Sequence, residues 1–266
     1  MRIYVCVKQV PDTSGKVAVK ENGTLDRASM ATIINPDDMN AMEAALKLKD
    51  ETGCQVTVVT MGPSPAAEML RELIAMGADD GILISSREFG GSDTFATSQI
   101  IAGAIHYAGL SDEDIIFCGR QAIDGDTAQV GPQIAEKLDI PQVTYAAEIK
   151  KNRKTLEVKR ALEDGYLRIE VQTPCLITCI KELNVPRYKT LSGIKHCYEK
   201  PIEVYDFEKL KDEPLIELDT IGLKGSPTNI FKSFTPPQKG IGQMLPGADK
   251  NTVKMLVEKL KDQHVI

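Results

Sequence analysis

The chain has 266 residues, of which 42% are apolar, and carries 32 lysines and arginines against 38 aspartates and glutamates, for a net charge of −6. A net acidic chain lacks the basic surface of a general nucleic-acid binder, and no apolar run approaches the roughly 20 residues of a membrane span. The chain begins directly as a strand, without the apolar region of a signal peptide. These features predict a soluble, cytoplasmic protein that binds neither nucleic acid nor membrane.

The first 140 residues alternate short apolar runs with helix-like segments. Strands are expected at 2–8, 55–61, 81–85 and 115–118, and helices after 35–38, at 66–76, at 93–107 and at 129–138. Asn35-Pro36-Asp37-Asp38 is a helix-start signal, and Gly53 and Gly77 are expected to end the first two helices. This alternation predicts an α/β fold with a doubly wound, mostly parallel sheet, Rossmann-like and of the adenine-nucleotide-binding type.

The pattern changes after residue 143. Strands are expected at 143–149, 155–162, 166–173 and 175–180, which adds a β-hairpin region to the sheet. The region with Gly240, Gly242 and three prolines is interpreted as a flexible turn, and 249–262 as an amphipathic helix with one apolar stripe formed by Val253, Leu256, Val257 and Leu260. We therefore divide the chain into a nucleotide-binding domain at 1–200 and a C-terminal arm at 201–266 that packs on a partner. The alternative is a final helix packed on its own domain.

The six cysteines predict no metal site. No pair has the Cys-x-x-Cys spacing of a zinc or iron–sulfur ligand set. Cys6, Cys118 and Cys175 lie in apolar runs and are expected to be buried thiols.

Ligands of doubly wound sheets lie beyond the carboxyl ends of the strands. Segments 6–8, 61–62, 86–94 and 119–127 should therefore converge at one edge, with 35–38 close by. In the loop 119–131, Gly119 and Gly125 permit sharp bends, and Asp126 and Thr127 are N-cap candidates. The free amides of a helix start attract phosphate, so this loop is interpreted as a phosphate-binding loop for an adenine nucleotide. The alternative is an ordinary strand-to-helix turn, since neither the P-loop nor the Gly-x-Gly-x-x-Gly motif is present.

The residues predicted to bind the nucleotide come from these segments. They are Cys6, Val7, Lys8, Asn35, Asp37, Asp38, Met61, Gly62, Arg87, Gly90, Gly91, Ser92, Asp93, Thr94, Gly119, Arg120, Gln121, Ala122, Asp124, Gly125, Asp126, Thr127, Gln129, Val130 and Gly131.

The chain resembles the small (beta) subunit of electron transfer flavoproteins over nearly its whole length. The resemblance rests on several motifs, namely Val7-Lys8-Gln9-Val10, Asn35-Pro36, Met76-Gly77-Ala78-Asp79, the 119–131 loop with Gln121-Ala122-Ile123-Asp124, Val158 to Gly165, Pro174, and Asn184 to Leu191. One departure is Leu167, where the family pattern usually has Glu or Gln. The resemblance implies a heterodimer with a larger alpha subunit and an adenine nucleotide on the edge described above.

The family has two branches, which hold either a structural AMP or a complete FAD at this place. The run Gly90-Gly91-Ser92-Asp93-Thr94 looks like that of the flavin-bifurcating branch. Gly90 and Gly91 leave room for a flat ring, and Arg87 could stabilise a reduced, anionic flavin by its charge. The bifurcating branch is therefore favoured, and a capped, glycine-hinged loop is the plain structural alternative.

For that branch the resemblance implies that NADH gives a hydride to the FAD of this subunit. One electron then passes to the alpha-subunit FAD and an acyl-CoA dehydrogenase, and the other to ferredoxin or flavodoxin. No side chain is assigned as a catalyst, so whether the chain is an enzyme by itself stays open. The resemblance also implies that Leu191 anchors the dehydrogenase. The alternatives are a non-bifurcating subunit with AMP and a stand-alone adenine-nucleotide-binding regulatory module.

Overall fold

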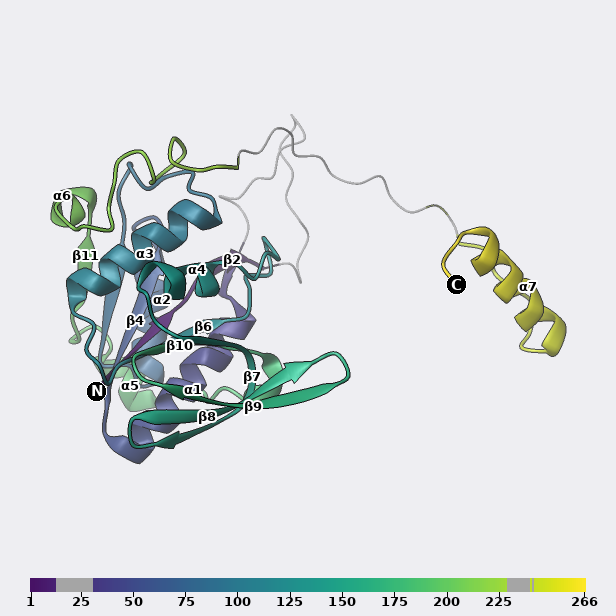
Figure 1. Ribbon diagram of the computed structural model, residues 1–266, viewed down its shortest axis with the longest axis horizontal. Helices are drawn as coiled ribbons and strands as arrows, with labels where there is room; N and C mark the ends of the chain where they lie inside the picture. The colour runs from purple at the N-terminus through teal and green to yellow at the C-terminus, as the bar shows by residue number, and fades with distance from the viewer. Residues whose placement is uncertain (13–30, 229–239, 241) are drawn as a thin grey trace.

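A computed structural model describes residues 1–12, 31–228, 240 and 242–266 of the chain. Its main sheet has the strand order β11-β5-β4-β1-β6-β10-β7-β8-β9 (Figure 1). The strands are β1 (Arg2–Cys6), β4 (Gln55–Met61), β5 (Asp80–Ile84), β6 (Ile115–Gly119), β7 (Gln142–Asn152), β8 (Thr155–Leu162), β9 (Gly165–Gln172), β10 (Cys175–Cys179) and β11 (Ile202–Tyr205). Every neighbouring pair from β11 to β7 is parallel, whereas β7, β8 and β9 pair antiparallel.

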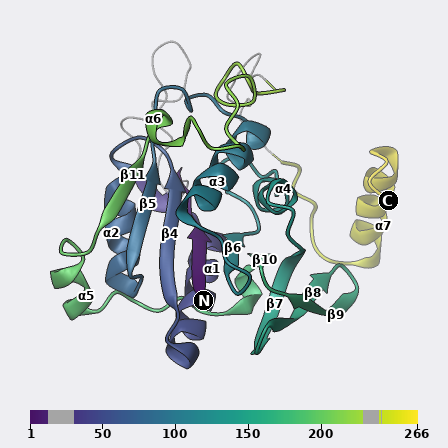
Figure 2. The same ribbon diagram turned by 60° about the vertical axis from the view of Figure 1, so that its left-hand side comes forward.

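Helices cover both faces of the parallel part of the sheet (Figure 2). They are α1 (Pro36–Thr52) and α2 (Ala66–Met76) on one face, and α3 (Thr94–Ala108) and α4 (Val130–Lys137) on the other. Successive side chains of a strand point to opposite faces. Ile3 and Val5 therefore pack into the core with α1 and α2, while Tyr4 and Cys6 pack into the second core with α3 and α4. This confirms the predicted doubly wound α/β fold and explains why the parallel strands read as continuous apolar runs.

The local signals in the sequence act as expected at most helix ends. Pro36 stands in the first turn of α1, and Gly53 ends that helix in the left-handed conformation, with φ of 70°. Gly77 follows α2. Asp93 caps α3 by accepting a hydrogen bond from the Ala96 amide.

Near the N-terminus the structure differs from the expectation. The first strand ends at Cys6 rather than at residue 8, because the Lys8 amide turns away to donate to Asp38. The chain then forms a small antiparallel ribbon of β2 (Gln9–Pro11) and β3 (Thr32–Ile34), which the sequence did not predict. The polar stretch between these two strands, residues 13–30, lies outside the described residues.

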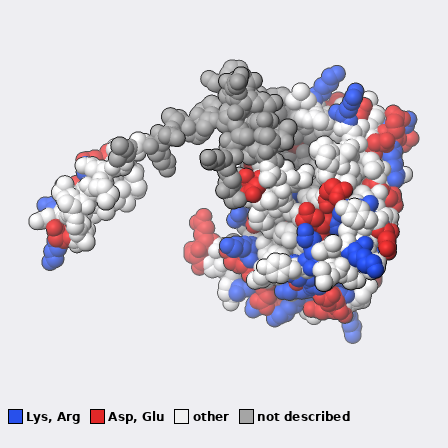
Figure 3. All heavy atoms as spheres, turned by 180° about the vertical axis from the view of Figure 1, so that it is seen from behind, with Lys and Arg blue, Asp and Glu red and all other residues white. Residues whose placement is uncertain are grey.

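After β10 come a 3-10 turn (Lys181–Leu183) and α5 (Leu191–His196), and after β11 comes α6 (Phe207–Leu210). Residues 202–228 lie on the sheet domain, since β11 pairs with β5 and the chain beyond α6 packs on α3. The last helix, α7 (Lys250–Asp262), stands apart from that domain in Figures 1 and 3. The division at residue 200 stays a prediction. Of the expected turn region, Gly240 and Gly242 are exposed, whereas Pro236, Pro237 and Ile241 fall outside the described ranges.

Among the helices described, none is both long and apolar enough to cross a bilayer.

Candidate functional site

The order in which the chain adds strands to the sheet reverses between β1 and β6. From β1 the chain moves to β4 and then β5 on one side, and β6 returns to pair with β1 on the other side. At such a switch point the loops beyond the strand ends diverge and leave a crevice for a ligand. The loops after β1 and β6 are therefore the natural walls of a site, which is called the rim below.

The start of α1 ties these two strand ends together. Asp38 accepts hydrogen bonds from the Lys8 amide at 2.8 Å and from the Gly119 amide at 3.1 Å. Asn35 donates from Nδ2 to the Gln121 carbonyl at 2.8 Å and accepts from the Ile123 amide at 3.1 Å. Asn35 and Asp38 are buried and act by holding the loops in place.

Burial dominates the electrostatics of these residues. Desolvation raises the pKa of Asp38 to about 7, although hydrogen bonds from Asn35 and from the Lys8 and Gly119 amides oppose the shift. Desolvation also raises the pKa of Asp37, and the charge of Arg120 opposes it. The Arg120 Nε lies 3.2 Å from Asp37 Oδ2, close enough for an ion pair but too poorly aligned for a hydrogen bond.

The loop after β6 is held by contacts within itself. The Ala122 carbonyl accepts from the amides of Gly125 and Asp126, and Gln121 Nε2 donates to Asp126 Oδ1 at 2.8 Å. Lys8 pairs with Asp124 at 2.8 Å and so closes the loop against the end of β1.

The predicted caps of α4 are wrong. The N-cap position is occupied by Gln129, whose side chain makes no capping hydrogen bond, and α4 has no acidic residue in its first turn. Asp126 instead lies three residues earlier at φ of 50°, where its carboxylate bonds to Gln121, and Thr127 beside it is exposed. The N-terminus of α4, which begins at Val130, carries the positive end of the helix dipole. No acidic residue in the first turn of the helix offsets this charge.

In the described part of the chain, a hydrogen bond joins the loop after β5 to the loop after β6. Thr94 Oγ1 donates to Gln129 Oε1 at 2.9 Å, directly beside the start of α4. Ser92 donates to the Phe89 carbonyl, which fixes the bend before the helix. Arg87, Gly90 and Gly91 are exposed on this loop.

The remaining predicted residues line the strand ends below the loops. Val7 donates from its amide to the Val59 carbonyl, and the Gly62 amide donates to the Ile84 carbonyl, so that the ends of β1, β4 and β5 stay in register beyond the sheet. Met61 is the last residue of β4 and is partly buried. Cys6 is buried beneath the rim, and a hydrogen bond with Cys6 together with burial raises the pKa of the Cys118 thiol. The raised pKa keeps the Cys118 thiol protonated, which makes it a poor nucleophile.

The three glycines of the loop after β6 have different reasons to be small. A Cβ on Gly119 would lie 2.2 Å from Asp38 Oδ1, and one on Gly131 would lie 2.8 Å from Thr178 Cγ2. Both are demanded by packing within the chain. A Cβ on Gly125 would meet open space, so at this position the fold itself leaves room beside the main chain.

The rim therefore brings segments 6–8, 35–38 and 119–127 into direct contact. Segment 86–94 is joined to the same loop through the bond of Thr94 to Gln129, and the end of β4 lies next to them. Each rim carboxylate already has a protein partner, namely Arg120 for Asp37, two amides for Asp38, the Ala96 amide for Asp93, Lys8 for Asp124 and Gln121 for Asp126. No group of His, Cys, Asp or Glu in the described part of the chain could hold a metal ion. A helix start without an acidic residue in its first turn, at an edge whose loops also carry Arg87 and Arg120, is suited to an anion such as a phosphate.

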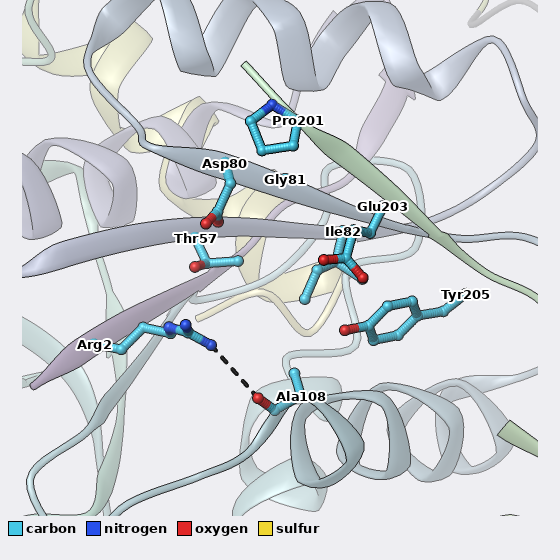
Figure 4. A pocket seen from close by; sticks show the side chains of 9 residues that line it. All are labelled: Arg2, Thr57, Asp80, Gly81, Ile82, Ala108, Pro201, Glu203 and Tyr205. Carbon is cyan, nitrogen blue, oxygen red and sulfur yellow. Dashed lines mark hydrogen bonds between the residues drawn. The ribbon is translucent and has the colours of Figure 1, made fainter. Parts of the chain in front are cut away.

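Two cavities found among the described residues lie elsewhere. One, of about 80 Å³, opens at the amino-terminal edge of the sheet, where Arg2, Thr57 and Asp80 surround it (Figure 4). The other, of about 290 Å³, lies beside the ribbon of β2 and β3, next to Met39 and Met69. Neither is lined by a residue predicted to bind the nucleotide.

Sequence reasoning missed the residues that hold the loop after β5 from outside. Ser226 and Thr228 bond to Asp93 across more than 130 positions of sequence. They stand in a polar stretch with no strand or helix pattern, so no local signal could have identified them.

Leu191 lies away from the rim. It begins α5, its side chain is 87% exposed, and Val185 and Tyr188 nearby are equally exposed. The helix is capped by Thr190, which accepts from the Gly193 amide at 2.8 Å.

Comparison with known proteins agrees with this architecture. The family model described as the electron transfer flavoprotein domain matches residues 22–210. Over the full length of both proteins, the chain is 77% identical to the acryloyl-CoA reductase electron transfer subunit gamma of Anaerotignum propionicum and 52% identical to the caffeyl-CoA reductase-Etf complex subunit CarD of Acetobacterium woodii. It is 48% identical, again over full length, to the electron transfer flavoprotein subunit beta of Thermoanaerobacterium thermosaccharolyticum. The chain therefore belongs to the electron transfer flavoprotein family and is a subunit of its beta type.

Proposed function

We propose that this beta-type subunit holds FAD at the rim, takes part in NADH oxidation, and bifurcates the electrons within a heterodimeric electron transfer flavoprotein. The single observation that carries the nucleotide site is the start of α4. It lies at the switch point of the sheet without an acidic partner and is framed by the loops after β5 and β6. An anion placed there would interact with the helix dipole and with main-chain amides.

Different residues of the chain would contribute to nucleotide binding in different ways. Asn35 and Asp38 fix the two main-chain loops, and Thr94 and Gln129 join the loop after β5 to the start of α4. Arg120 supplies positive charge that Asp37 only partly offsets at 3.2 Å. The open space beside Gly125 lets a diphosphate approach the main chain.

FAD is preferred over AMP because of the loop after β5. Arg87 is exposed on this loop, close to the exposed main chain of Gly90 and Gly91, and supplies the charge that an extended flavin nucleotide requires beyond its adenine end. FAD, when bound, would supply the chemistry of accepting a hydride and releasing electrons singly. The protein side contributes orientation and charge and no nucleophile, so the subunit acts as an electron carrier within a complex.

The proposed partners are an alpha subunit, an acyl-CoA dehydrogenase, and ferredoxin or flavodoxin. One full-length relative is named as an acryloyl-CoA reductase electron transfer subunit and another as a subunit of a caffeyl-CoA reductase-Etf complex, which supports a partner that acts on an acyl-CoA thioester. Leu191 is the proposed anchor for that partner, since an apolar side chain exposed to 87% at a capped helix start is suited to a hydrophobic hot spot. A cytoplasmic location is proposed because all six cysteines are buried and unpaired.

The test is to identify the nucleotide. The complex of this chain with its alpha subunit is purified, denatured, and analysed for released nucleotides, and is titrated anaerobically with NADH. We expect FAD from each subunit and bleaching of flavin by NADH. FAD from the alpha subunit alone, accompanied by AMP, would overturn the FAD proposal. A stable monomer without a partner would favour a stand-alone nucleotide-binding module.

A pair of variants locates the nucleotide at the rim. Gly125 and Gly165 are both exposed, and an added Cβ at either meets no atom within 4 Å. We expect Gly125→Glu to lose the nucleotide of this subunit, because a carboxylate would face the phosphates, with no loss of fold. Gly165→Glu, at the first residue of β9, is the matched control and should keep the nucleotide. Equal retention in both variants would place the nucleotide elsewhere.

A further inference from the structure

A stretch of chain beyond α6 runs back along α3 toward the rim (Figure 1). This stretch, residues 211–228, is called the strap. It meets the far end of α3 at Glu213, which lies 2.5 Å from His106 Nδ1. At mid-helix, Ile216 packs so closely on Gly103 that a Cβ there would lie 2.7 Å from its Cδ1. The strap therefore follows α3 from its last turn to its first residue.

At the start of α3 the strap bonds directly to the cap residue. Asp93 Oδ1 accepts from the Ala96 amide at 3.0 Å and so caps the helix. Asp93 Oδ2 accepts from the Thr228 amide at 2.9 Å and from Thr228 Oγ1 at 2.7 Å. The Asp93 amide donates to Ser226 Oγ at 2.9 Å. Both oxygens and the amide of Asp93 are thereby used, and two of the three groups bond to the strap.

These bonds also keep the cap charged. Burial raises the pKa of Asp93, but the hydrogen bonds from Ala96 and Thr228 together lower it below its ordinary value. Ser226, itself only 7% exposed, completes the arrangement by donating to the Gly222 carbonyl at 2.7 Å. Hydrogen bonds to a charged acceptor are stronger than neutral ones, so this end of the strap is firmly attached.

The strap also packs against the glycines of the loop after β5. The Leu223 amide donates to the Gly90 carbonyl at 3.0 Å, and a Cβ on Gly91 would lie 3.0 Å from Leu223 Cβ. Gly222, at φ of 64°, comes so close to the Glu88 carbonyl that a Cβ there would lie 2.1 Å from its oxygen. Gly91 and Gly222 are thus needed for the fit between loop and strap, a role that the sequence did not indicate.

We propose that the strap, through Ser226 and Thr228, positions the loop 90–94 as one wall of the nucleotide site. The inference rests on the proposed function, because it names residues that shape the same site. We infer that the end of β5 alone does not fix the position of Thr94, and therefore does not fix its hydrogen bond to Gln129. Asp93 lies one residue before Thr94, and its contacts with the strap set the direction of the loop. Ser226 and Thr228 are positioning residues and touch no nucleotide themselves.

The experiment compares hydrogen exchange and nucleotide retention in the full-length chain and its complex. Ser226→Ala removes the acceptor of the Asp93 amide, and Thr228→Val removes one donor to Asp93 while nearly keeping the side-chain volume. We expect the double variant to exchange amides 90–96 about three- to tenfold faster, as the loss of one or two hydrogen bonds implies, and to retain less nucleotide. Thr228→Ser by itself keeps the hydroxyl donor to Asp93, so this single variant should match the wild type in both properties.

The matched control is Thr220→Val, in the same strap, where the hydroxyl donates only to the Glu217 carbonyl at 3.0 Å. It should leave the loop unchanged. Unchanged exchange of amides 90–96 in the double variant would overturn the proposal, as would an equal rise throughout β1 and β4, which would indicate general destabilisation. Faster exchange with full nucleotide retention would overturn the positioning role. Hydrogen exchange is also measured on the nucleotide-free chain. The effect of the strap on amides 90–96 can then be judged even if the FAD proposal fails.

Discussion

At the scale of single residues, the rim depends on polar groups buried under its loops. Asp38 shows this most clearly, because one carboxylate joins the end of β1 to the end of β6 through the Lys8 and Gly119 amides. Its burial has an energetic consequence, since a buried carboxyl group binds its proton more tightly than an exposed one. The pKa of about 7 in the folded chain, against an ordinary value of 3.8, makes folding depend on pH.

We predict that Asp38 lowers stability as the pH rises. The folded state holds this proton between about pH 4 and 7 whereas the unfolded state has lost it, so the contribution is fully present below pH 4 and is lost as pH rises through 7. The full effect is at most about 4 kcal/mol. Urea unfolding of wild type and Asp38→Asn at pH 5, 6, 7 and 8 should show the wild type losing free energy of unfolding relative to the variant.

Asp126→Asn serves as the control, because Asp126 is an exposed carboxylate in the same rim. Its free energy of unfolding should run parallel to that of wild type over this range. If Asp38→Asn also runs parallel to wild type, Asp38 does not titrate between pH 5 and 8 and the prediction is wrong.

At the scale of elements, α7 is an amphipathic helix without a covering surface on the described chain. Asp249 caps it by accepting from the amides of Asn251 and Thr252, so the helix is locally well defined. The predicted apolar stripe includes Val253 and Leu256, which are 52% and 44% exposed. A helix that keeps an apolar stripe in water is suited to burial against another chain. We infer that the alpha subunit covers it.

Leu256→Glu should weaken assembly with the alpha subunit while leaving the sheet domain intact. A charge in the middle of an apolar interface typically costs several kcal/mol when left unpaired, so we expect at least about a hundredfold loss of affinity in a titration followed by light scattering. Met255→Glu is the matched control, because Met255 is 45% exposed but lies on the opposite side of the helix. Equal effects of the two substitutions would show that the stripe is not the interface.

At the scale of the whole molecule, the rim and α5, which begins at Leu191, lie at opposite edges of the sheet (Figure 2). The rim is built at the carboxyl ends of the strands, whereas α5 packs on the last turn of α2, where Gly193 approaches the Ala75 carbonyl. A helix that follows a parallel strand runs antiparallel to it, so the end of α2 lies at the amino-terminal edge. A partner that docks at Leu191 would therefore leave the nucleotide site proposed at the rim uncovered.

This separation predicts that Leu191→Asp lowers electron delivery to the acyl-CoA dehydrogenase partner by about tenfold or more, since it removes one exposed hot-spot side chain. Nucleotide content and assembly with the alpha subunit should not change. The measurement is steady-state reduction of the dehydrogenase by the complex as a function of dehydrogenase concentration, with an expected rise in KM. Unaltered KM would remove Leu191 from the docking surface, and loss of nucleotide would show that the two edges are not independent.

Much of this architecture follows from the sequence alone. Apolar runs bounded by glycine and proline determined β4 and α2 to the residue, and Asn35-Pro36 and Asp93 marked the starts of α1 and α3, because caps, breakers and periodicity act over a few neighbouring positions. Convergence of the loops also followed, since parallel strands share a carboxyl edge.

Two things were decided only by the tertiary structure. One is the uncapped start of α4, where Asp126 bonds back to Gln121 instead of capping. The other is the strap, because contacts between Asp93 and Ser226 or Thr228 join residues more than 130 positions apart, and nothing in local patterning encodes which distant polar group will fill a buried hydrogen bond.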